Sequence, residues 1–212
     1  MANIKGAETI CHAFSKDPVN LSTGNFIYDR TDLEVGGREP FVFRRFYNAI
    51  NGREGVLGKD WNHNYEVHLE FTDGEAVLLR EDGKEERFFW EKDRYLSLFA
   101  SEGVLEKAEE GYMYRTREQK VYRFDREGMC LETETLLGSR VTFTYETEAP
   151  FRLVKVQKDT GEFFSFSYDA EGKLERVEDH TGRSVAYRYQ GELLKEVTLP
   201  DENTFRYGYT PQ

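Results

Sequence analysis

The sequence predicts an all-β fold, a long antiparallel meander of β-hairpins. Apolar and polar residues alternate with period two, which places every second side chain on one face of a strand. Turn residues separate these runs at short intervals, and the runs have strand length, about 6–9 residues. Phe and Tyr, with 16 and 13 residues, favour strands over helices.

The individual strands follow from the alternation. In the run VTFTY, at 141–145, Phe143 and Tyr145 face one way and two threonines face the other. The run SVAYRY, at 184–189, repeats this pattern. Only the stretch LFASEGVLEKAEEG, at 98–111, can also be interpreted as a short helix.

The turns between the strands have a recurring composition. Asp-Gly and related pairs tolerate the positive φ angles of tight hairpins. Turn signals stand at residues 35–37, 72–74, 81–84, 126–128, 137–139, 159–162, 169–173, 180–182, 190–192 and 200–203. Their spacing predicts hairpins in which each strand pairs with the next one along the chain.

The last 90 residues contain a sequence repeat. The aromatic residue that closes each outgoing strand stands at 124, 145, 168, 189 and 209, so the steps are 21, 23, 21 and 20 residues. A two-stranded unit cannot bury its apolar face alone, so the units are expected to stack into one sheet. The aromatic pairs expected to form a single stripe are Tyr122/Phe124, Phe143/Tyr145, Phe166/Tyr168, Tyr187/Tyr189 and Tyr207/Tyr209.

The final residues, FRYGYTPQ, stop in the middle of a repeat. A strand without its partner hairpin leaves an open apolar edge, which is a liability in a free protein. The sequence therefore predicts a fragment of a longer array. The strand at 204–209 is the expected site of self-association through edge addition.

The repeat resembles the YD repeat of Rhs and teneurin proteins, whose unit contains Tyr-Asp-x-x-Gly. The full match is Tyr168, Asp169 and Gly172. A match with Phe in place of Tyr is Phe124, Asp125 and Gly128. The other units lack the Asp, so the pattern is degenerate over about 120–212.

Three blocks in the first third look like the opening domain that precedes the YD repeats of bacterial Rhs proteins. They are DPVNLSTGNF at 17–26, EPFVFRRFYNA at 39–49 and GVLGKDWNHNYEVHL at 55–69. Family-motif residues with an expected structural role are Asp17, Pro18, Asn20, Thr23, Gly24, Arg45, Tyr47, Trp61, His63, Asn64 and Tyr65. The expected division is a lead-in at 1–16, the opening domain at 17–72, connecting β-hairpins at 73–119 and YD-type repeats at 120–212.

The resemblance implies a structural function. In that family the repeats form a hollow β shell that encloses a C-terminal toxin, and neither the toxin nor the self-cleavage region is found in this chain. The expected function is a non-catalytic, N-terminal segment of a polymorphic-toxin shell. Its expected partners are the rest of the shell and the toxin, and its expected location is secreted or at the cell surface, after synthesis in the cytoplasm.

The opening blocks also have a plain physical interpretation. Pro18 and Gly24 fit a turn that leads into a strand. In the run FVFRRF, strict burial of one face is broken by Arg44 or Arg45, whose guanidinium can stack on an aromatic ring or pair with a carboxylate. We therefore expect structural pairings there and no anion site.

The run DWNHNYEVH is the densest polar and aromatic cluster. His63, Tyr65 and Val67 share one face of a strand, while His68 lies on the other face. One metal ion cannot easily take both histidines, so neither a metal nor a cofactor is expected. No nucleophile elbow or phosphate loop occurs, so an enzyme would need an unforeseen pocket around His63 and Asn64 with a carboxylate nearby.

A second interpretation is a carbohydrate-binding or cell-surface module that uses the aromatic stripe. The burial of the stripe distinguishes this binding module from the structural segment. An enclosed stripe is packing, whereas an open one is a ligand platform.

Composition narrows the partners further. The chain has 29 basic and 40 acidic residues, and its net charge of −11 argues against binding to nucleic acid. Cys11 and Cys130 are expected to be free thiols. The sequence has no apolar run of membrane-spanning length, and its N-terminus lacks the apolar region of a cleaved signal peptide.

Overall fold

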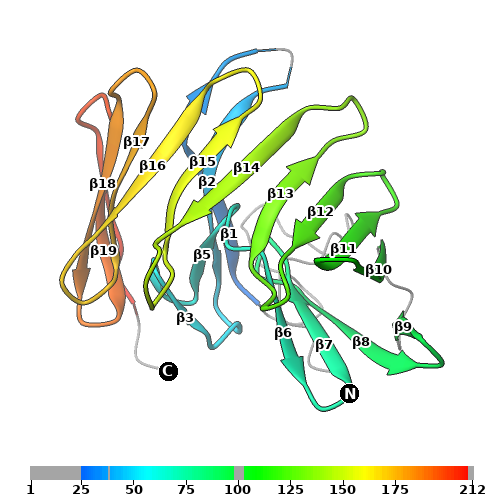
Figure 1. The fold of residues 1–212 in the computed structure, drawn as a ribbon. Coiled ribbons are helices and arrows are strands. Elements are labelled where there is room, and N and C mark those ends of the chain that lie inside the picture. Colours follow the sequence, from blue (N-terminus) through cyan, green and yellow to red (C-terminus); the bar gives the residue numbers. More distant parts are fainter. Residues whose placement is uncertain (1–24, 38, 98–102, 210–212) are drawn as a thin grey trace.

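The computed structural model describes residues 25–37, 39–97 and 103–209, which form antiparallel strands in three main sheets (Figure 1). The opening sheet has the order β1 (Ile27–Val35), β2 (Phe41–Asn48) and β5 (Trp61–His63). A small hairpin, β3 (Glu54–Gly55) and β4 (Gly58–Lys59), lies between β2 and β5 in the sequence; we call it the docking hairpin. The connecting sheet consists of β6 (His68–Thr72), β7 (Glu75–Leu79), β8 (Glu85–Glu91) and β9 (Arg94–Ser97).

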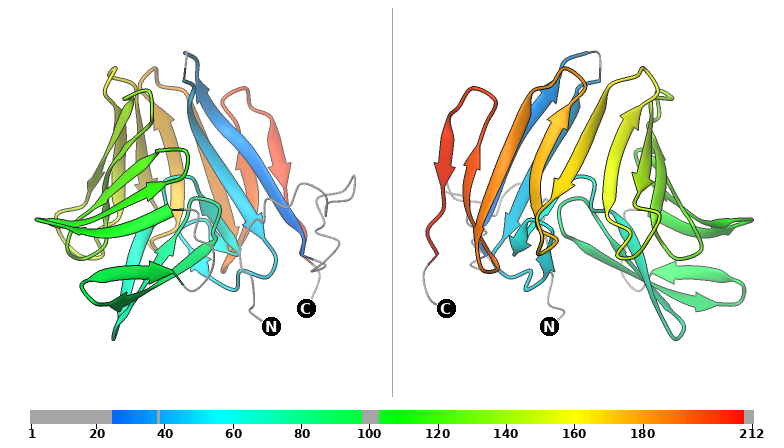
Figure 2. Two further views of the ribbon diagram at one scale, coloured as in Figure 1. Left: turned by 90° about the vertical axis from the view of Figure 1, so that its right-hand side faces the viewer. Right: turned by 60° about the vertical axis from the view of Figure 1, so that its left-hand side comes forward.

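The repeat sheet has eleven strands in sequence order, as expected for a meander. Its strands are β10 (Gly103–Ala108), β11 (Gly111–Thr116), β12 (Val121–Phe124), β13 (Cys130–Glu134), β14 (Arg140–Tyr145), β15 (Leu153–Lys158), β16 (Phe163–Tyr168), β17 (Leu174–Asp179), β18 (Ser184–Gln190), β19 (Leu193–Thr198) and β20 (Thr204–Arg206). Figure 2 shows this sheet curving around β1 and β2. The predicted all-β antiparallel fold is therefore confirmed.

Two expectations for local structure were wrong. The stretch at 98–111 is no helix where it is described, because Gly103–Ala108 is a strand that pairs along its whole length with β11. Pairing with β11 buries Leu105, and a lone helical turn here would have no such partner strand. The run at 63–68 is not one strand either: β5 ends at His63 and β6 begins at His68, with a turn between them.

One five-residue turn recurs along the repeat sheet and explains the Asp and Gly of the repeat. In the turn that starts at Asp169, the Gly172 N–H donates to the Asp169 carbonyl at 3.0 Å. The Asp169 carboxylate accepts the N–H groups of Glu171 and Lys173, both at 2.9 Å. Gly172 has φ +82°, a left-handed conformation that glycine adopts without strain. The turn at Asp179 has the same bonds.

The core lies between the opening sheet and the concave side of the repeat sheet. Phe41 stacks on Phe164 with ring centroids 4.5 Å apart, and Phe43 meets Phe166 edge to face at 5.9 Å. All four rings are buried. Burial of these aromatic rings stabilises the junction of the sheets.

Candidate functional site at the sheet interface

The interface is formed by one face of β2 against successive repeat units. Phe41, Phe43, Arg45 and Tyr47 share this face because side chains in a strand alternate. The first two contact rings of β16, whereas Tyr47 contacts Tyr209, beyond β20, at 6.3 Å. This face of β2 therefore contacts β16 at its start and the segment after β20 at its end.

Arg45 lies at the centre of this interface and is fully buried. Its Nε donates to Asp32 Oδ2 at 2.6 Å, and its Nη1 donates to the Tyr207 hydroxyl at 2.5 Å. Tyr187 donates its hydroxyl to the same Asp32 oxygen at 2.9 Å. The guanidinium carbon also lies 5.0 Å from the ring centroid of Trp61, within cation–π range. Arg45 therefore pairs with a carboxylate and lies beside an aromatic ring.

The buried ion pair joins the opening sheet to two consecutive repeat units. Asp32 and Arg45 come from β1 and β2, whereas Tyr187 and Tyr207 come from units 20 residues apart. Burial raises the pKa of Asp32 in spite of Arg45, which indicates how unfavourable an isolated charge would be here. Such a pair can select one packing arrangement because any other register leaves a charge unpaired.

The docking hairpin contacts the repeat sheet through backbone groups. The Leu174 N–H donates to the Val56 carbonyl at 2.7 Å, and the Lys59 N–H donates to the Glu192 carbonyl at 2.8 Å. Gly58 has φ +90°, and a Cβ there would stand 2.5 Å from the Glu192 carbonyl oxygen. Only glycine allows this approach.

His63 and its neighbours are tied to the backbone of the opening sheet. The His63 ring stacks on Phe166 at 5.6 Å, and its Nδ1 accepts the Tyr65 N–H at 3.2 Å. Burial lowers the pKa of His63 to about 3, so the imidazole is neutral. The side-chain oxygen of Asn64 accepts the Arg44 backbone N–H, and its side-chain nitrogen donates to the Val42 carbonyl, both in β2.

Glu66 supplies the carboxylate near this cluster, but it also binds backbone. Its two oxygens accept the N–H groups of His63 at 2.8 Å and Val56 at 3.4 Å, which links the end of β5 to the docking hairpin. Burial raises the pKa of Glu66 to about 7. His63 is thus buried, and the side-chain oxygen and nitrogen of Asn64 are both hydrogen-bonded to backbone groups of β2.

Glu66 should make stability depend on pH. Its pKa of about 7 in the folded state exceeds 4.5, the unperturbed value, so its stabilising effect is fully present below pH 4.5 and is lost as pH rises through 7. In the wild type, the free energy of unfolding should fall by about 2–4 kcal/mol between pH 4.5 and 7. Glu66→Gln should abolish this fall, which urea unfolding at each pH measures. Glu70→Gln is the control, because hydrogen bonds from His68 and Arg53 lower the pKa of Glu70 to about 2. Equal slopes above pH 4.5 in wild type and Glu66→Gln would contradict this expectation.

The tyrosines that close the repeat strands form a hydrogen-bond ladder. The Tyr168 hydroxyl donates to the Leu153 carbonyl at 2.7 Å, and the same bond over 15 residues recurs in other units. Those bonds join Tyr145 to Cys130, Tyr189 to Leu174 and Tyr209 to Leu194, at 2.7–2.8 Å. Each of the four acceptor residues also lies opposite the closing aromatic of the preceding unit, at a register shift. A bulge disrupts the ladder locally, so the hydroxyl satisfies a carbonyl there.

Removing one of these hydroxyls should leave a buried carbonyl without its donor. We expect Tyr168→Phe to lower the free energy of unfolding by about 1–2 kcal/mol, measured by urea unfolding. The same change at Tyr145 or Tyr189 should cost a similar amount, because the bond has the same geometry. Losses below about 0.5 kcal/mol at all three positions would show that the ladder is not stabilising.

The aromatic stripe is largely enclosed. Phe166 and Tyr187 of the stripe are buried against the opening sheet. By the burial criterion, these rings are packing and do not form a platform for sugars. Tyr168 is half-buried and packs at the margin of the same core.

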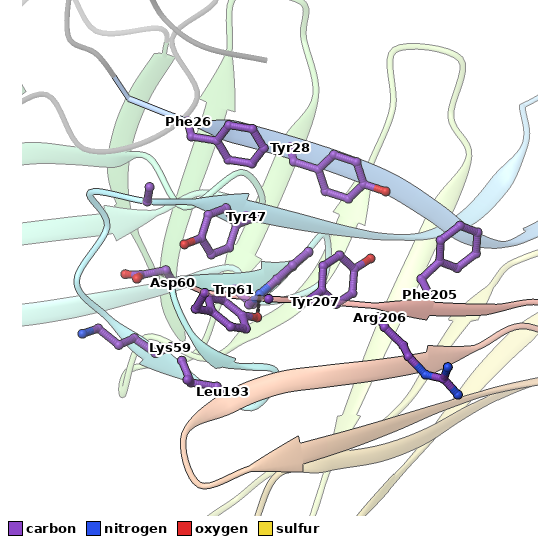
Figure 3. A pocket seen from close by; sticks show the side chains of 13 residues that line it. Phe26, Tyr28, Tyr47, Lys59, Asp60, Trp61, Leu193, Phe205, Arg206 and Tyr207 are labelled. Atoms are coloured by element: carbon purple, nitrogen blue, oxygen red, sulfur yellow. Dashed lines mark hydrogen bonds between the residues drawn. The ribbon is translucent and has the colours of Figure 1, made fainter. Parts of the chain in front are cut away.

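A groove of about 670 Å³ lies where the stripe ends, between β1, β2 and the segment after β20 (Figure 3). Its walls are mainly aromatic, with Phe26, Tyr28, Tyr47, Trp61 and Tyr207. Trp61 meets Tyr207 edge to face at 5.1 Å and donates its indole N–H to the Tyr209 hydroxyl at 3.0 Å. The motif residues Tyr47 and Trp61 are therefore brought together here.

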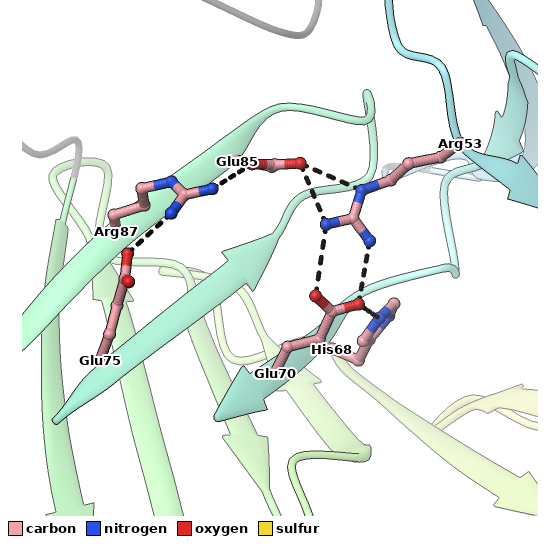
Figure 4. Close-up of polar contacts among 6 residues, drawn as sticks. All are labelled: Arg53, His68, Glu70, Glu75, Glu85 and Arg87. Carbon is pink, nitrogen blue, oxygen red and sulfur yellow. Dashed lines mark hydrogen bonds and ion pairs between the residues drawn. The ribbon is translucent and has the colours of Figure 1, made fainter. Parts of the chain in front are cut away.

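A chain of ion pairs holds the loop before the docking hairpin against the connecting sheet (Figure 4). Arg53 contacts Glu70 at 2.9 Å and Glu85 at 3.0 Å, and Arg87 continues the chain from Glu85 to Glu75. These groups are partly solvated, so each pair adds little stability. Their effect is to orient the loop.

Several expectations concern other residues. Asp17, Pro18, Asn20, Thr23, Gly24 and Cys11 lie outside the described residues. Cys130 is a free, buried thiol, as expected, and burial raises its pKa. The described ranges contain no group of three or more His, Cys, Asp or Glu that could hold a metal ion. Among the residues with a described position, no helix is long and apolar enough to span a membrane.

Sequence reasoning missed Asp32, Glu66 and the docking hairpin. Asp32 stands among alternating residues of β1, and nothing nearby in the sequence indicates that its partner is Arg45. The sequence does contain a signal for the hydroxyl ladder. Most residues that close a repeat strand are Tyr and not Phe, which indicates that a hydroxyl donor is needed there.

Comparisons with known proteins agree with this architecture. Residues 16–88 match a family described as a domain of unknown function, DUF6531, and residues 112–212 match the teneurin YD-shell family. The chain is 27% identical over 207 residues to the probable deoxyribonuclease RhsB of Dickeya dadantii strain 3937, an alignment that covers 95% of this chain and 13% of that protein.

Two more relatives carry other names. The tRNA nuclease WapA of Bacillus subtilis strain 168 is 26% identical over 240 residues, covering 90% of this chain and 10% of that protein. The double-stranded DNA deaminase toxin A of Burkholderia cenocepacia strain H111 is 23% identical over 206 residues, covering 91% of this chain and 13% of that protein. The chain thus spans only 10–13% of the length of these relatives.

Proposed function

We propose that this chain, which belongs to the Rhs/YD-repeat proteins and is part of their shell, is a non-catalytic segment that begins a β shell around a C-terminal toxin. The observation that carries the proposal is the packing of the opening sheet inside the curved repeat sheet, with Arg45 linking β1 and β2 to two repeat units. A segment built in this way starts and orients a sheet that further repeats can extend.

The chemistry of the candidate site supports a structural role. His63 is neutral and buried, and Asn64, Tyr65 and Glu66 hydrogen-bond to the backbone. The motif residues Arg45, Tyr47, Trp61, Tyr168, Asp169 and Gly172 also take part in packing, pairing or turns. We assign the opening domain to 17–72, the connecting hairpins to 73–119 and the repeats to 120–212.

The printed names of the relatives, two nucleases and a DNA deaminase, support an enzymatic toxin elsewhere in a longer protein. The test is limited proteolysis of that longer protein, with and without this segment. We expect the C-terminal domain to resist protease only when the segment is present. Equal cleavage in both proteins would overturn the enclosing role, and nuclease or deaminase activity of the isolated chain would overturn the non-catalytic one.

Secretion or display at the cell surface is part of the same proposal, because a toxin carried in a shell acts outside the cell that makes it. Self-association through the C-terminal strand is a second element. The edge of β20 that faces away from β19 is unpaired among the described strands. Light scattering of the isolated chain tests it, and a mass that stays monomeric at high concentration would rule it out.

A further inference from the structure

The opening domain contacts the repeat sheet at both of its rims. The upper rim in Figure 1 includes the turns that follow β13, β15 and β17, and the turn between β1 and β2 lies beside it. The lower rim includes the turns that follow β16 and β18, next to the docking hairpin. Two segments that are separate in the sequence therefore hold the two ends of the repeat strands.

At the upper rim, three successive repeat turns are bonded to the ends of the β1–β2 turn. Lys158, the last residue of β15, donates its Nζ to the Glu39 carbonyl at 2.8 Å. Arg183, just before β18, donates its Nη2 to the Glu34 carbonyl at 2.8 Å. The Thr135 hydroxyl, just after β13, donates to the Glu39 carboxylate at 3.3 Å.

These contacts draw the upper rim together. In a flat sheet β13 and β17 would lie about 19 Å apart, because neighbouring strands are about 4.8 Å apart. The β1–β2 turn is narrower than that, since β1 and β2 are neighbouring strands. The long side chains of Lys158 and Arg183 bridge part of the distance, and the curvature of the sheet supplies the rest.

At the lower rim, the bonds are between backbone groups. Val56 of the docking hairpin accepts the Leu174 N–H, and Lys59 donates to the Glu192 carbonyl. Leu174 begins β17 and Glu192 precedes β19, so one short hairpin holds two strands that are not neighbours. The approach at Gly58 is so close that only glycine allows it.

The repeat units have a second source of bending. The register shifts at the closing aromatics are bulges, and a bulge bends its strand and increases the local twist. A bulge acts within one pair of strands, whereas the rim contacts join strands that are not neighbours. The two causes of curvature can therefore be separated by substitution.

We propose that Glu34 and Glu39 at the upper rim, together with the docking hairpin at the lower rim, form a clamp that sets the curvature of the repeat sheet. The clamp bends the first repeat units around the opening sheet, and the bulges make the strands able to follow. This inference rests on the proposed function and adds that the opening domain determines the shape of the sheet that it begins.

The test measures a distance along the upper rim. Spin labels are attached to Leu137→Cys and His180→Cys, which are exposed positions outside the clamp. Cys11→Ser removes one competing thiol, and burial keeps the other, Cys130, from the labelling reagent. Double electron–electron resonance then gives the distance between the two labels.

The clamp variant combines Lys158→Met with Gly58→Ala. The first substitution removes the Nζ that bonds to Glu39. The second places a Cβ 2.5 Å from the Glu192 carbonyl oxygen and forces the docking hairpin away. We expect the distance between the labels to rise by about 5 Å, which is one strand spacing.

The matched control combines Lys155→Met with Gly52→Ala. Lys155 also belongs to β15, but its Nζ bonds to Gln157 of the same strand. Gly52 also has a positive φ, +64°, and a Cβ there would meet no described residue within 4 Å apart from its chain neighbours. The control should leave the distance between the labels unchanged.

Tyr168→Phe distinguishes the clamp from the bulges. This substitution removes a bond beside a bulge, so it should lower stability and leave the distance between the labels unchanged. An unchanged distance in a folded clamp variant, or an equal rise in the control or in Tyr168→Phe, would overturn the proposal. If the clamp variant does not fold, Lys158→Met alone is compared with Lys155→Met. A rise of about half a strand spacing is then expected, and no difference between the two would overturn the proposal as well.

This test and the proteolysis test can fail separately. The distance between the labels depends on this chain alone, whereas the resistance to protease depends on the toxin. A clamp can therefore be demonstrated in a chain that fails to enclose a toxin, and an enclosing segment can owe its curvature to the bulges.

Discussion

Replacing Arg45 by methionine is expected to lower the free energy of unfolding by about 3–5 kcal/mol, because it leaves the Asp32 carboxylate buried without its cation. Methionine keeps much of the side-chain volume, so the loss reports mainly on charge. The hydroxyl of Tyr187 would still donate to Asp32 but cannot neutralise its charge. Urea unfolding followed by circular dichroism measures the change.

The neighbouring residue supplies a matched control. Arg44 lies on the other face of β2 with 43% of its side chain exposed, and its contact with Asp29 at 3.7 Å is solvated. Arg44→Met should therefore change stability by less than about 0.5 kcal/mol. Adding Asp32→Asn to Arg45→Met should recover part of the loss, because the unpaired charge is gone. A loss below about 1 kcal/mol in Arg45→Met alone would show that water or another cation replaces the arginine.

Replacing Phe43 by alanine should have a comparable effect, about 3–5 kcal/mol, because it creates a cavity where the two sheets meet. The ring is fully buried. Its aromatic neighbours are His63, Tyr65, Phe164, Phe166 and Tyr187. These residues come from both sheets, so the cavity cannot close by a small shift of one strand.

The same variant tests whether the sheets unfold as one unit. We expect a single, earlier transition when circular dichroism and tryptophan fluorescence are recorded together, because Trp61 lies in the interface. Phe26→Ala is the control, since that ring is 41% exposed and should cost less than about 1 kcal/mol. Two separate transitions in wild type would show that the opening sheet is not part of the cooperative unit.

The repeat sheet was predictable because its determinants are local. Alternation indicates the faces, and the turns at Asp169 and Asp179 use bonds within five residues, so consecutive strands pair in sequence order. The bulges were not predictable, since the register shift at Tyr168 has no composition signal. The alternative of a helix is wrong for 103–111, the described part of the stretch at 98–111. Its apolar residues are too few to distinguish the two periods, and pairing with β11 decided the outcome.

The opening domain was predictable only in part. That Phe41, Phe43 and Arg45 share one face follows from alternation. The expectation that an arginine breaks the burial of one face was wrong for this face, because Arg45 is fully buried beside its carboxylate partner. The identity of that partner does not follow, because Asp32 is 13 residues away on another strand and Tyr207 is 162 residues away.

By itself the sequence determined the all-β class, the period of the repeat, the composition of its turns and the face that each strand buries. These properties depend on neighbours in the chain, through backbone geometry and alternation. Only the tertiary structure decided that the opening sheet packs inside the repeat sheet, that Glu66 anchors the docking hairpin, and that the groove lies beside Phe26. Those features arise from contacts between distant segments, whose pairing is selected by shape and charge in the folded protein and leaves no periodic signal in the sequence.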